Sequence, residues 1–299
     1  MKKVLITGSN GLLGQKLTDL YRTLPHIELI ATARGANRYP TSEDYTYAEL
    51  DITNKGNVIA IIGNYKPDCI IHTAAMTNVD QCETDKEGCD LLNVFAVENL
   101  VEAANAVNAH FIHLSTDFIF DGLHGPYTED AKPKPLSYYG WSKLKAEEIV
   151  MQKAAKWSIA RTVLVYGLVA DMSRSNIVLW AKGALEKGQP INVVDDQYRT
   201  PTLAEDLAMG CRLIEEKEAE GIYNISGKDF MSIMELVQRV ADFFKLDKSI
   251  IQRVSSETLN QPAKRPPITG FDLAKSTEVL GYNPHSFEEG IALLMTQIK

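Results

Sequence analysis

Three glycines near the N-terminus constrain the fold more than any other feature of this chain. They are Gly8, Gly11 and Gly14, and they follow the apolar run 4–6 at intervals of three residues. A helical pattern of leucines begins at Leu12. A strand, a glycine turn and a helix in this order let backbone N–H groups and a helix N-terminus approach a pyrophosphate, because no side chain intervenes. The stretch predicts a dinucleotide-binding turn, although an ordinary strand-to-helix turn can show the same spacing.

Beyond this turn, short apolar runs alternate with stretches that carry apolar residues at helical spacing. The expected strands are 28–33, 69–72, 110–114, 161–166, 191–194 and 221–224. One more strand, the third in chain order, is expected to end at 50–53. The expected helices are 55–65, 91–107, 138–150, 176–185, 203–214, 231–244 and 288–298. This alternation predicts an α/β fold, a Rossmann-type doubly wound parallel sheet with a smaller, interleaved C-terminal substrate domain. The sheet domain is expected to span 1–166, with 191–224 returning to it, and the smaller domain 167–190 and 225–299.

Composition and charge narrow the class of function. The 299 residues are 45% hydrophobic and 23% charged, as in an ordinary globular protein. A formal net charge of −8 argues against nucleic acid as the main partner. The N-terminal apolar run is too short for a signal peptide and no segment is long enough to span a membrane, so a cytoplasmic protein is expected. The four cysteines lack metal-ligand spacing, which predicts reduced structural thiols and no metal centre.

The second expected strand ends at Arg34, with Arg38 close behind. In dinucleotide-binding folds an acidic residue at this place selects NAD, whereas an arginine suits the extra phosphate of NADP. Arg34 therefore favours NADP, although it could also be a solvated surface residue. Asp51, after the third strand, could hold the adenine edge or cap the next helix, since Asp is a strong N-cap.

Small residues, Thr73, Ala74 and Ala75, follow the buried strand 69–72. At the carboxyl end of a strand they allow a cofactor to lie close. His72 belongs to the apolar run itself, and we interpret it as a satisfied core histidine rather than a catalyst.

Tyr139 and Lys143 are four residues apart on an expected helix, so they share one face. A phenol has an ordinary pKa of about 10, and a nearby ammonium would lower it toward the range useful for proton transfer. Thr116, at the end of the strand 110–114, could offer its hydroxyl to the same carbonyl oxygen. A Tyr and a Lys at this spacing are common on surfaces, but their order after the glycine turn and the strand-end Ser115–Asp117 favours an acid/base unit.

With these residues in view, the chain resembles the extended short-chain dehydrogenases/reductases, and within that superfamily most closely the dTDP-4-dehydrorhamnose reductases. The resemblance covers almost the full length. It is carried by 7–14, 73–77 with 79–80, Asn93, 115–122, 126–127, 139–144, 161–162, 195–197 with 201–202, and 265–266.

The resemblance implies hydride transfer from NADPH, or from NADH, to C4 of a nucleotide-linked 4-keto sugar. Tyr139 would protonate the sugar oxygen, Lys143 would hold the nicotinamide ribose, and Thr116 would orient the carbonyl. A homodimer is a further expectation from the resemblance.

The resemblance and the residue patterns together assign three groups of site residues. The candidate catalytic residues are Thr116, Tyr139 and Lys143. The candidate cofactor-binding residues are Gly8, Asn10, Gly11, Leu12, Leu13, Gly14, Arg34, Asp51, Ile52, Ala74, Ala75, Thr77, Asn93, Tyr139 and Lys143. The candidate substrate-binding residues are Thr116, Asp117, Phe118, Asn176, Gln197 and Arg265, of which Arg265 would reach the nucleotide diphosphate.

Two departures from the family pattern lie on the expected substrate side. Leu164 stands where the family often has Trp, and Arg199 stands where a glycine is usual. Two other functions therefore remain open. An epimerase or dehydratase of the same superfamily would recycle a tightly held NAD. A cofactor-binding regulatory subunit similar to that of methionine adenosyltransferase would bind NADP and a protein partner without turnover, and Arg199 with Pro201 and Thr202 is similar to its pattern.

Overall fold

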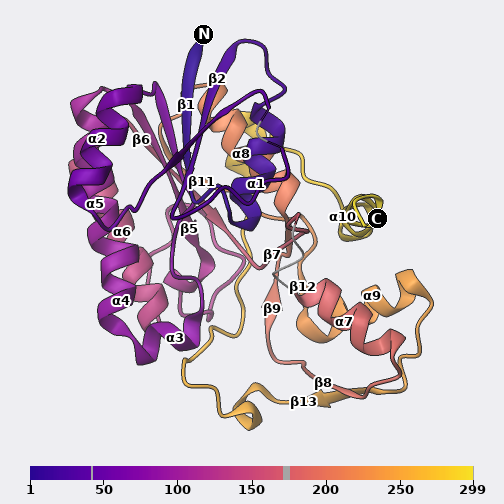
Figure 1. Ribbon diagram of the computed structural model, residues 1–299. Helices are drawn as coiled ribbons and strands as arrows, with labels where there is room; N and C mark the ends of the chain where they lie inside the picture. The colour runs from indigo at the N-terminus through magenta and orange to yellow at the C-terminus, as the bar shows by residue number, and fades with distance from the viewer. Residues whose placement is uncertain (42, 171–175, 299) are drawn as a thin grey trace.

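A seven-stranded, fully parallel sheet forms the centre of the molecule (Figure 1). The structure is a computed structural model that describes residues 1–41, 43–170 and 176–298. In spatial order the strands are β11 (Gly221–Asn224), β6 (Trp157–Thr162), β5 (His110–Thr116), β4 (Cys69–His72), β1 (Lys2–Thr7), β2 (Ile27–Ala33) and β3 (Thr46–Glu49). The strand order reverses beside β1, which confirms the doubly wound α/β architecture.

Helices cover both faces of this sheet, as Figure 1 shows. One face carries α2 (Lys55–Tyr65), α5 (Ala96–Ala106) and α6 (Tyr138–Lys153), and the other carries α1 (Leu12–Tyr21) and α8 (Ala204–Glu216). Alternation along β1 explains the two layers. Val4 and Ile6 belong to the core on the α1 and α8 side, whereas Leu5 belongs to the core on the α2 and α5 side.

Short elements connect these layers near the carboxyl ends of the strands. They are α3 (Val79–Thr84), α4 (Lys86–Asp90), a π-helical turn (Leu91–Phe95) that runs into α5, and a 3₁₀ turn (Asp117–Ile119) after β5. The sequence predicted one continuous helix over 91–107, and the π turn is the difference. It also predicted a third strand closing at 50–53, whereas β3 ends at Glu49.

A smaller lobe lies beyond the carboxyl ends of the strands (Figure 1). Its elements include α7 (Ile177–Glu186), α9 (Ile233–Phe244), α10 (Phe287–Thr296), β8 (Ile191–Val194) and β13 (Ile251–Val254). Three two-residue strands, β7 (Val165–Tyr166), β9 (Tyr198–Arg199) and β10 (Thr202–Leu203), run between the lobes, with β12 (Met231–Ser232) paired to β9. The lobe also carries a 3₁₀ turn (Ser256–Leu259), and a second π turn (Ser276–Leu280) packs against α8.

One part of the expected domain layout is wrong. The sequence predicted that 191–224 returns to the main sheet, and within this range β11 does so, beside β6. The strand β8 instead pairs in parallel with β13, and Ile191 and Val193 pack into the apolar core of the smaller lobe. The pairing partner lies about sixty residues further along the chain, where a local apolar pattern gives no indication of it.

The described helices include none that is both long and apolar enough to cross a bilayer.

Candidate functional site

The glycine turn joins β1 to α1 in a conformation that requires glycine. Gly8 has φ +72°, and a Cβ there would lie 2.8 Å from the backbone nitrogen of Ala74. A Cβ on Gly14 would lie 2.2 Å from the carbonyl oxygen of Gly8. Gly11 is the N-cap of α1 and has no side chain to satisfy the N–H groups of the first turn, which starts at Leu12. These free donors at a bare helix N-terminus fit a pyrophosphate. Leu13, the second residue of α1, packs against the apolar core on the α1 and α8 side of the sheet.

Asn10 ties this turn to the loop after β2. Its amide nitrogen donates to the carbonyl oxygen of Ala36 at 2.9 Å, and its oxygen accepts from the backbone N–H of Arg38 at 2.8 Å. The side chains of Arg34 and Arg38 are both exposed beside this loop. The region therefore presents two cationic groups next to the glycine turn, which suits a phosphate-bearing ribose.

Asp51 does not cap the following helix. Asn54 is the N-cap of α2, and Asp51 instead accepts from the backbone N–H and the hydroxyl of Thr53 at 2.9 and 2.6 Å. These hydrogen bonds lower the pKa of Asp51, with a further contribution from Arg34. Ile52 beside it is buried. The capping interpretation is therefore wrong, and a contact of Asp51 with the adenine edge stays a prediction.

Asn93 fixes the loop after β4 by hydrogen bonds to its backbone. Ala74 and Ala75 in this loop are half-buried, and Thr77 is exposed. Asn93 is buried, accepts from the backbone N–H of Met76 at 2.8 Å, and donates to the Met76 carbonyl at 3.0 Å and to the Ser142 hydroxyl at 3.1 Å. The amide of Asn93 thus joins this loop to Ser142 of α6, and a role of Asn93 in cofactor binding stays a prediction.

Thr116 and Tyr139 meet at the carboxyl end of β5. Ser137 caps α6 by accepting from the backbone N–H of Gly140 at 3.2 Å. Gly140 lets the helix lie against the carbonyl oxygen of Phe118, which a Cβ would approach to 2.1 Å. Burial raises the pKa of Tyr139, and the polar side chain of Thr116 partly offsets this rise. The ring of Phe118 packs edge-on against Tyr139, with centroids 5.7 Å apart.

The pKa of Tyr139 is shifted in the direction opposite to the one that the spacing to Lys143 predicted. The sequence predicted that the ammonium would lower the pKa of the phenol, whereas burial raises that pKa above its ordinary value. Lys143 is buried, and its Nζ lies 3.1 Å from Nε2 of His113 on β5. Burial lowers the pKa of Lys143 to about 8, with Glu147 and Cys89 acting in the opposite direction.

Arg199 lies beside Asp117, on the side of the site where the sequence predicted the substrate. Its Nε lies 3.7 Å from the Asp117 carboxylate, and both side chains are almost fully buried. Asp117 also accepts hydrogen bonds from the hydroxyls of Thr116 and Thr269. Burial raises the pKa of Asp117, and the guanidinium of Arg199 acts against this rise.

The segment 265–269 crosses the site and is held at several points. Arg199 donates to the carbonyl oxygens of Pro266 and Pro267 at 2.8 and 3.1 Å. Arg265 forms a bidentate ion pair with Asp80 on α3, at 3.2 and 2.8 Å. Because of this pair, the pKa of Asp80 is lowered and the Arg265 guanidinium is directed toward α3. Ion pairing to Asp80 was not anticipated from the sequence, since the two residues are far apart in the chain.

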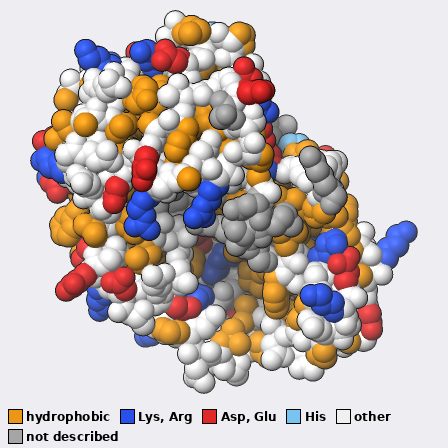
Figure 2. All heavy atoms as spheres, in the orientation of Figure 1, with side chains coloured by type: hydrophobic (Ala, Val, Ile, Leu, Met, Phe, Trp, Pro, Cys, Tyr) orange, Lys and Arg blue, Asp and Glu red, His pale blue; other side chains and the backbone are white. Residues whose placement is uncertain are grey.

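Gln197 and Asn176, the remaining predicted substrate residues, both have intramolecular partners. Gln197 is buried, and its side-chain oxygen accepts from Arg199 at 3.4 Å. Asn176 caps α7 and donates to the carbonyl oxygen of Gly167 at 2.6 Å. Figure 2 shows the surface hollowed between the sheet and the smaller lobe, with Lys and Arg side chains inside the hollow.

Four site residues escaped the sequence analysis: His113, Asp80, Thr269 and Ser142. His113 could have been found, because a second polar residue inside the apolar strand run 110–114 needs a buried partner. The other three give no local signal, since their roles arise from contacts between distant segments.

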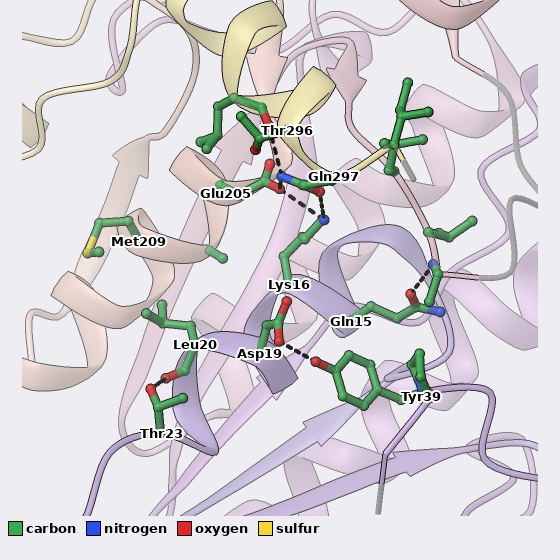
Figure 3. A pocket seen from close by; sticks show the side chains of 17 residues that line it. Gln15, Lys16, Asp19, Leu20, Thr23, Tyr39, Glu205, Met209, Thr296 and Gln297 are labelled. Carbon is green, nitrogen blue, oxygen red and sulfur yellow. Dashed lines mark hydrogen bonds and ion pairs between the residues drawn. The ribbon is translucent and has the colours of Figure 1, made fainter.

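A separate cavity of about 800 Å³ lies between α1, α8 and the C-terminal end of α10 (Figure 3). Lys16 spans it, with its Nζ 2.9 Å from Glu205 and 2.6 Å from the side-chain oxygen of Gln297. None of the predicted site residues lines this cavity, and Lys16 and Glu205 within it are paired with one another.

Within residues 1–41, 43–170 and 176–298, no cluster of three or more potential metal ligands occurs. The four cysteines are free and buried.

A glycine turn at the strand reversal, a strand-end Thr and a Tyr-Lys pair on the helix that follows define the extended short-chain dehydrogenase/reductase class. Comparison with known proteins narrows this class. The chain belongs to the RmlD substrate-binding domain family, whose model matches residues 1–299.

Two kinds of named relatives are similar to this chain. Methionine adenosyltransferase 2 subunit beta of Xenopus laevis is 32% identical over 262 residues, which cover 86% of this chain and 76% of that protein. The dTDP-4-dehydrorhamnose reductase of Aggregatibacter actinomycetemcomitans is 30% identical over 303 residues and covers 97% of each. Among solved structures, the dTDP-4-dehydrorhamnose reductase from Bacillus anthracis in complex with NADP matches all of both chains, with a TM-score of 0.85 and 28% identity.

Proposed function

We propose that this chain uses NADPH to reduce the 4-keto group of a nucleotide-linked deoxysugar, converting dTDP-4-dehydro-L-rhamnose to dTDP-L-rhamnose. The observation that carries the proposal is the arrangement of Thr116, Tyr139 and Lys143 at the carboxyl end of the sheet, next to the loop that contacts the glycine turn. The relatives named as reductases and the NADP complex of one of them support it.

The residues present fit a dinucleotide. Gly14 lets α1 pack closely against the backbone of the turn, and Gly11 leaves the N–H groups at the start of α1 without a side-chain cap, so a pyrophosphate can approach them. Arg34 and Arg38 supply positive charge for the extra phosphate of NADP, which is why we propose NADPH rather than NADH. When bound, NADPH would supply the hydride.

Tyr139 is the proposed proton donor. Because burial raises its pKa, the phenol is protonated at neutral pH and retains its proton until negative charge develops on the sugar oxygen. The Thr116 hydroxyl, which donates to Asp117 in this structure, would turn to donate to the same oxygen, and Lys143, one helical turn from Tyr139 on α6, would add positive charge to this part of the site. Fixed donors of this kind stabilise a developing alkoxide without reorganisation.

Three further expectations stay predictions: a homodimer, a cytoplasmic location, and no role for a metal.

A second candidate is a regulatory subunit that binds NADP and a protein partner without turnover. It is favoured by the relatives named methionine adenosyltransferase 2 subunit beta and by the Arg199–Asp117 pair, which fills part of the substrate side. An epimerase or dehydratase is a weaker alternative, because Arg34 favours NADP over a retained NAD.

Turnover measurements separate these candidates. NADPH oxidation would be followed by absorbance with dTDP-4-dehydro-L-rhamnose as substrate, in the wild type, in Tyr139→Phe and in the matched control Tyr138→Phe. Tyr138 donates its hydroxyl hydrogen to Asp90 at 2.8 Å, so its loss leaves the proposed donor in place. We expect Tyr139→Phe to lower kcat by about a hundredfold or more with NADPH binding retained, and Tyr138→Phe to keep most of the activity.

Rapid turnover by Tyr139→Phe would overturn the assignment of the donor. Absence of turnover in the wild type, with NADPH bound, would favour the regulatory subunit.

A further inference from the structure

Three buried polar residues lie in a row across the centre of the sheet, which also buries other polar side chains such as Thr32 and Ser158. Thr7 on β1, His72 on β4 and His113 on β5 are aligned in register on neighbouring strands. All three are buried. The Thr7 hydroxyl lies 2.7 Å from Nδ1 of His72, and the His72 ring stacks on that of His113 with centroids 5.4 Å apart. The row ends at Lys143 of α6, whose Nζ lies 3.1 Å from Nε2 of His113.

The direction of the hydrogen bond between Lys143 and His113 follows from their charges. Burial and the nearby Lys143 hold the pKa of His113 well below its ordinary value, so the ring is neutral at pH 7. A neutral ring carries one proton, and an ammonium can only donate. Nε2 of His113 therefore accepts from Lys143, and the ring proton is on Nδ1.

This arrangement leaves Nδ1 of His113 buried without a partner among the described residues. A buried unpaired donor is costly, and a leucine at the same place would pack without that cost. A histidine at this place is therefore better explained by the hydrogen bond that its Nε2 accepts from Lys143.

The surroundings of Lys143 show why an acceptor is needed there. The groups that face it are His113 and His72 from the sheet, Glu147 from its own helix, and Cys89 from α4. Glu147 is engaged in a buried bidentate pair with Arg161, at 3.0 and 2.7 Å. Among the described residues, no carboxylate lies within ion-pair distance of the Lys143 Nζ, and the side chain that hydrogen-bonds to it is His113.

We propose that His113 is a positioning residue: it accepts a hydrogen bond from the Lys143 ammonium and so keeps that group charged and directed toward the cofactor side of the site. His72 fixes the plane of the His113 ring by stacking on it, and Thr7, the last residue of β1 before the glycine turn, fixes His72. The row thus connects the dinucleotide turn with the lysine of the acid/base pair. The catalytic meaning of this positioning rests on the proposed reductase function, but the hydrogen bond itself does not.

A lysine titration tests the hydrogen bond without any cofactor or sugar. Protein labelled with carbon-13 at the lysine Cε atoms would be titrated by NMR, with the Lys143 signal assigned by its loss in Lys143→Arg. The pKa of Lys143 in the wild type is expected near 8. In His113→Leu the ammonium loses its acceptor, and we expect the midpoint to fall by about one pH unit.

Two variants control for effects of packing. His113→Gln retains an acceptor oxygen, and its midpoint should return to within about 0.3 of a pH unit of the wild type. His110→Leu removes another buried histidine of β5, which is bonded to Ser158 at 2.7 Å, and should leave the Lys143 midpoint unchanged. An unchanged midpoint in His113→Leu, an equal fall in His110→Leu, or no recovery in His113→Gln would each overturn the proposal.

NADPH affinity measured against pH by nicotinamide fluorescence gives the functional readout. At pH 8 a wild-type lysine with a midpoint near 8 is half protonated, and one with a midpoint one pH unit lower is about one-eleventh protonated. We therefore expect His113→Leu to bind NADPH about fivefold more weakly than the wild type at pH 8, with little difference at pH 6. Equal affinities at pH 8 would overturn the positioning role. A wild type that does not bind NADPH would instead refute the proposed function, and the lysine titration would still decide on the hydrogen bond.

Discussion

Replacing Arg199 with Met provides a quantitative test of how the substrate side is held together. The exposed fractions of the Arg199 and Asp117 side chains are 4% and 3%, and the substitution leaves the Asp117 carboxylate buried without its cation. It also removes the donors to the Pro266 and Pro267 carbonyls. Removing one partner of a buried ion pair costs about 3–5 kcal/mol, and we expect a loss of that size in the free energy of unfolding at pH 7.

The companion variant Arg199→Met/Asp117→Asn separates the charge from the lost hydrogen bonds. With no buried carboxylate left, the remaining loss should be about 1–2 kcal/mol, mainly from the two carbonyl groups. Urea unfolding followed by tryptophan fluorescence would measure both variants, with midpoints converted at a common slope.

The pH dependence of the single variant has a defined sign. Burial already raises the pKa of folded Asp117, and Arg199 opposes that rise, so its removal raises the pKa further above the unfolded value of about 4. The folded state then binds more protons than the unfolded one, and stability increases as pH falls from 7 toward that value. The loss in the free energy of unfolding caused by Arg199→Met should therefore become smaller at lower pH. A loss below about 1 kcal/mol at pH 7, or a deficit that grows on acidification, would refute the reasoning.

Two other substitutions have clear expected outcomes. Gly14→Ala brings a Cβ to 2.2 Å from the Gly8 carbonyl oxygen, so the affinity for NADPH, measured by fluorescence, should fall at least about tenfold. The control is Gly63→Ala, whose Cβ would lie in open space on α2. It should leave the affinity for NADPH unchanged and stabilise the helix by about 0.5–1 kcal/mol. An unaffected affinity in Gly14→Ala would contradict the close approach in the turn. Arg161→Met leaves Glu147 buried and unpaired and should cost about 3–5 kcal/mol in urea unfolding; a loss within experimental error would contradict the contribution of this buried ion pair.

The sequence sufficed for features that depend on neighbouring residues. The glycine turn, the alternation of strands and helices, and the pair Tyr139 and Lys143 on one helix face all follow from local spacing. The structure confirms the fold class and brings Thr116 to Tyr139, because α6 begins against the turn that follows β5 at the carboxyl edge of the sheet.

Features that depend on distant contacts or on burial could not be predicted in this way. The partner of Arg265 is Asp80, at a separation of 185 residues, and nothing near either position indicates it. The direction of the Tyr139 pKa was predicted wrongly because the spacing to Lys143 says nothing about how strongly the phenol is desolvated or which atom the ammonium contacts. Similarly, the pairing of β8 with β13 depends on the packing of the smaller lobe rather than on the apolar pattern of either strand.

The position of β11 at the edge of the sheet has a consequence for biosynthesis. Until residues 221–224 arrive, the outer edge of β6 has no strand beside it, and an open edge is a template for pairing with another chain. The core on the α1 side of the sheet is likewise completed late, since Leu207, Cys211 and Tyr282 belong to it. A nascent or truncated chain that ends near residue 166 therefore exposes both an unpaired strand edge and an apolar sheet face, and it would depend on chaperones to stay unaggregated until the C-terminal half is made.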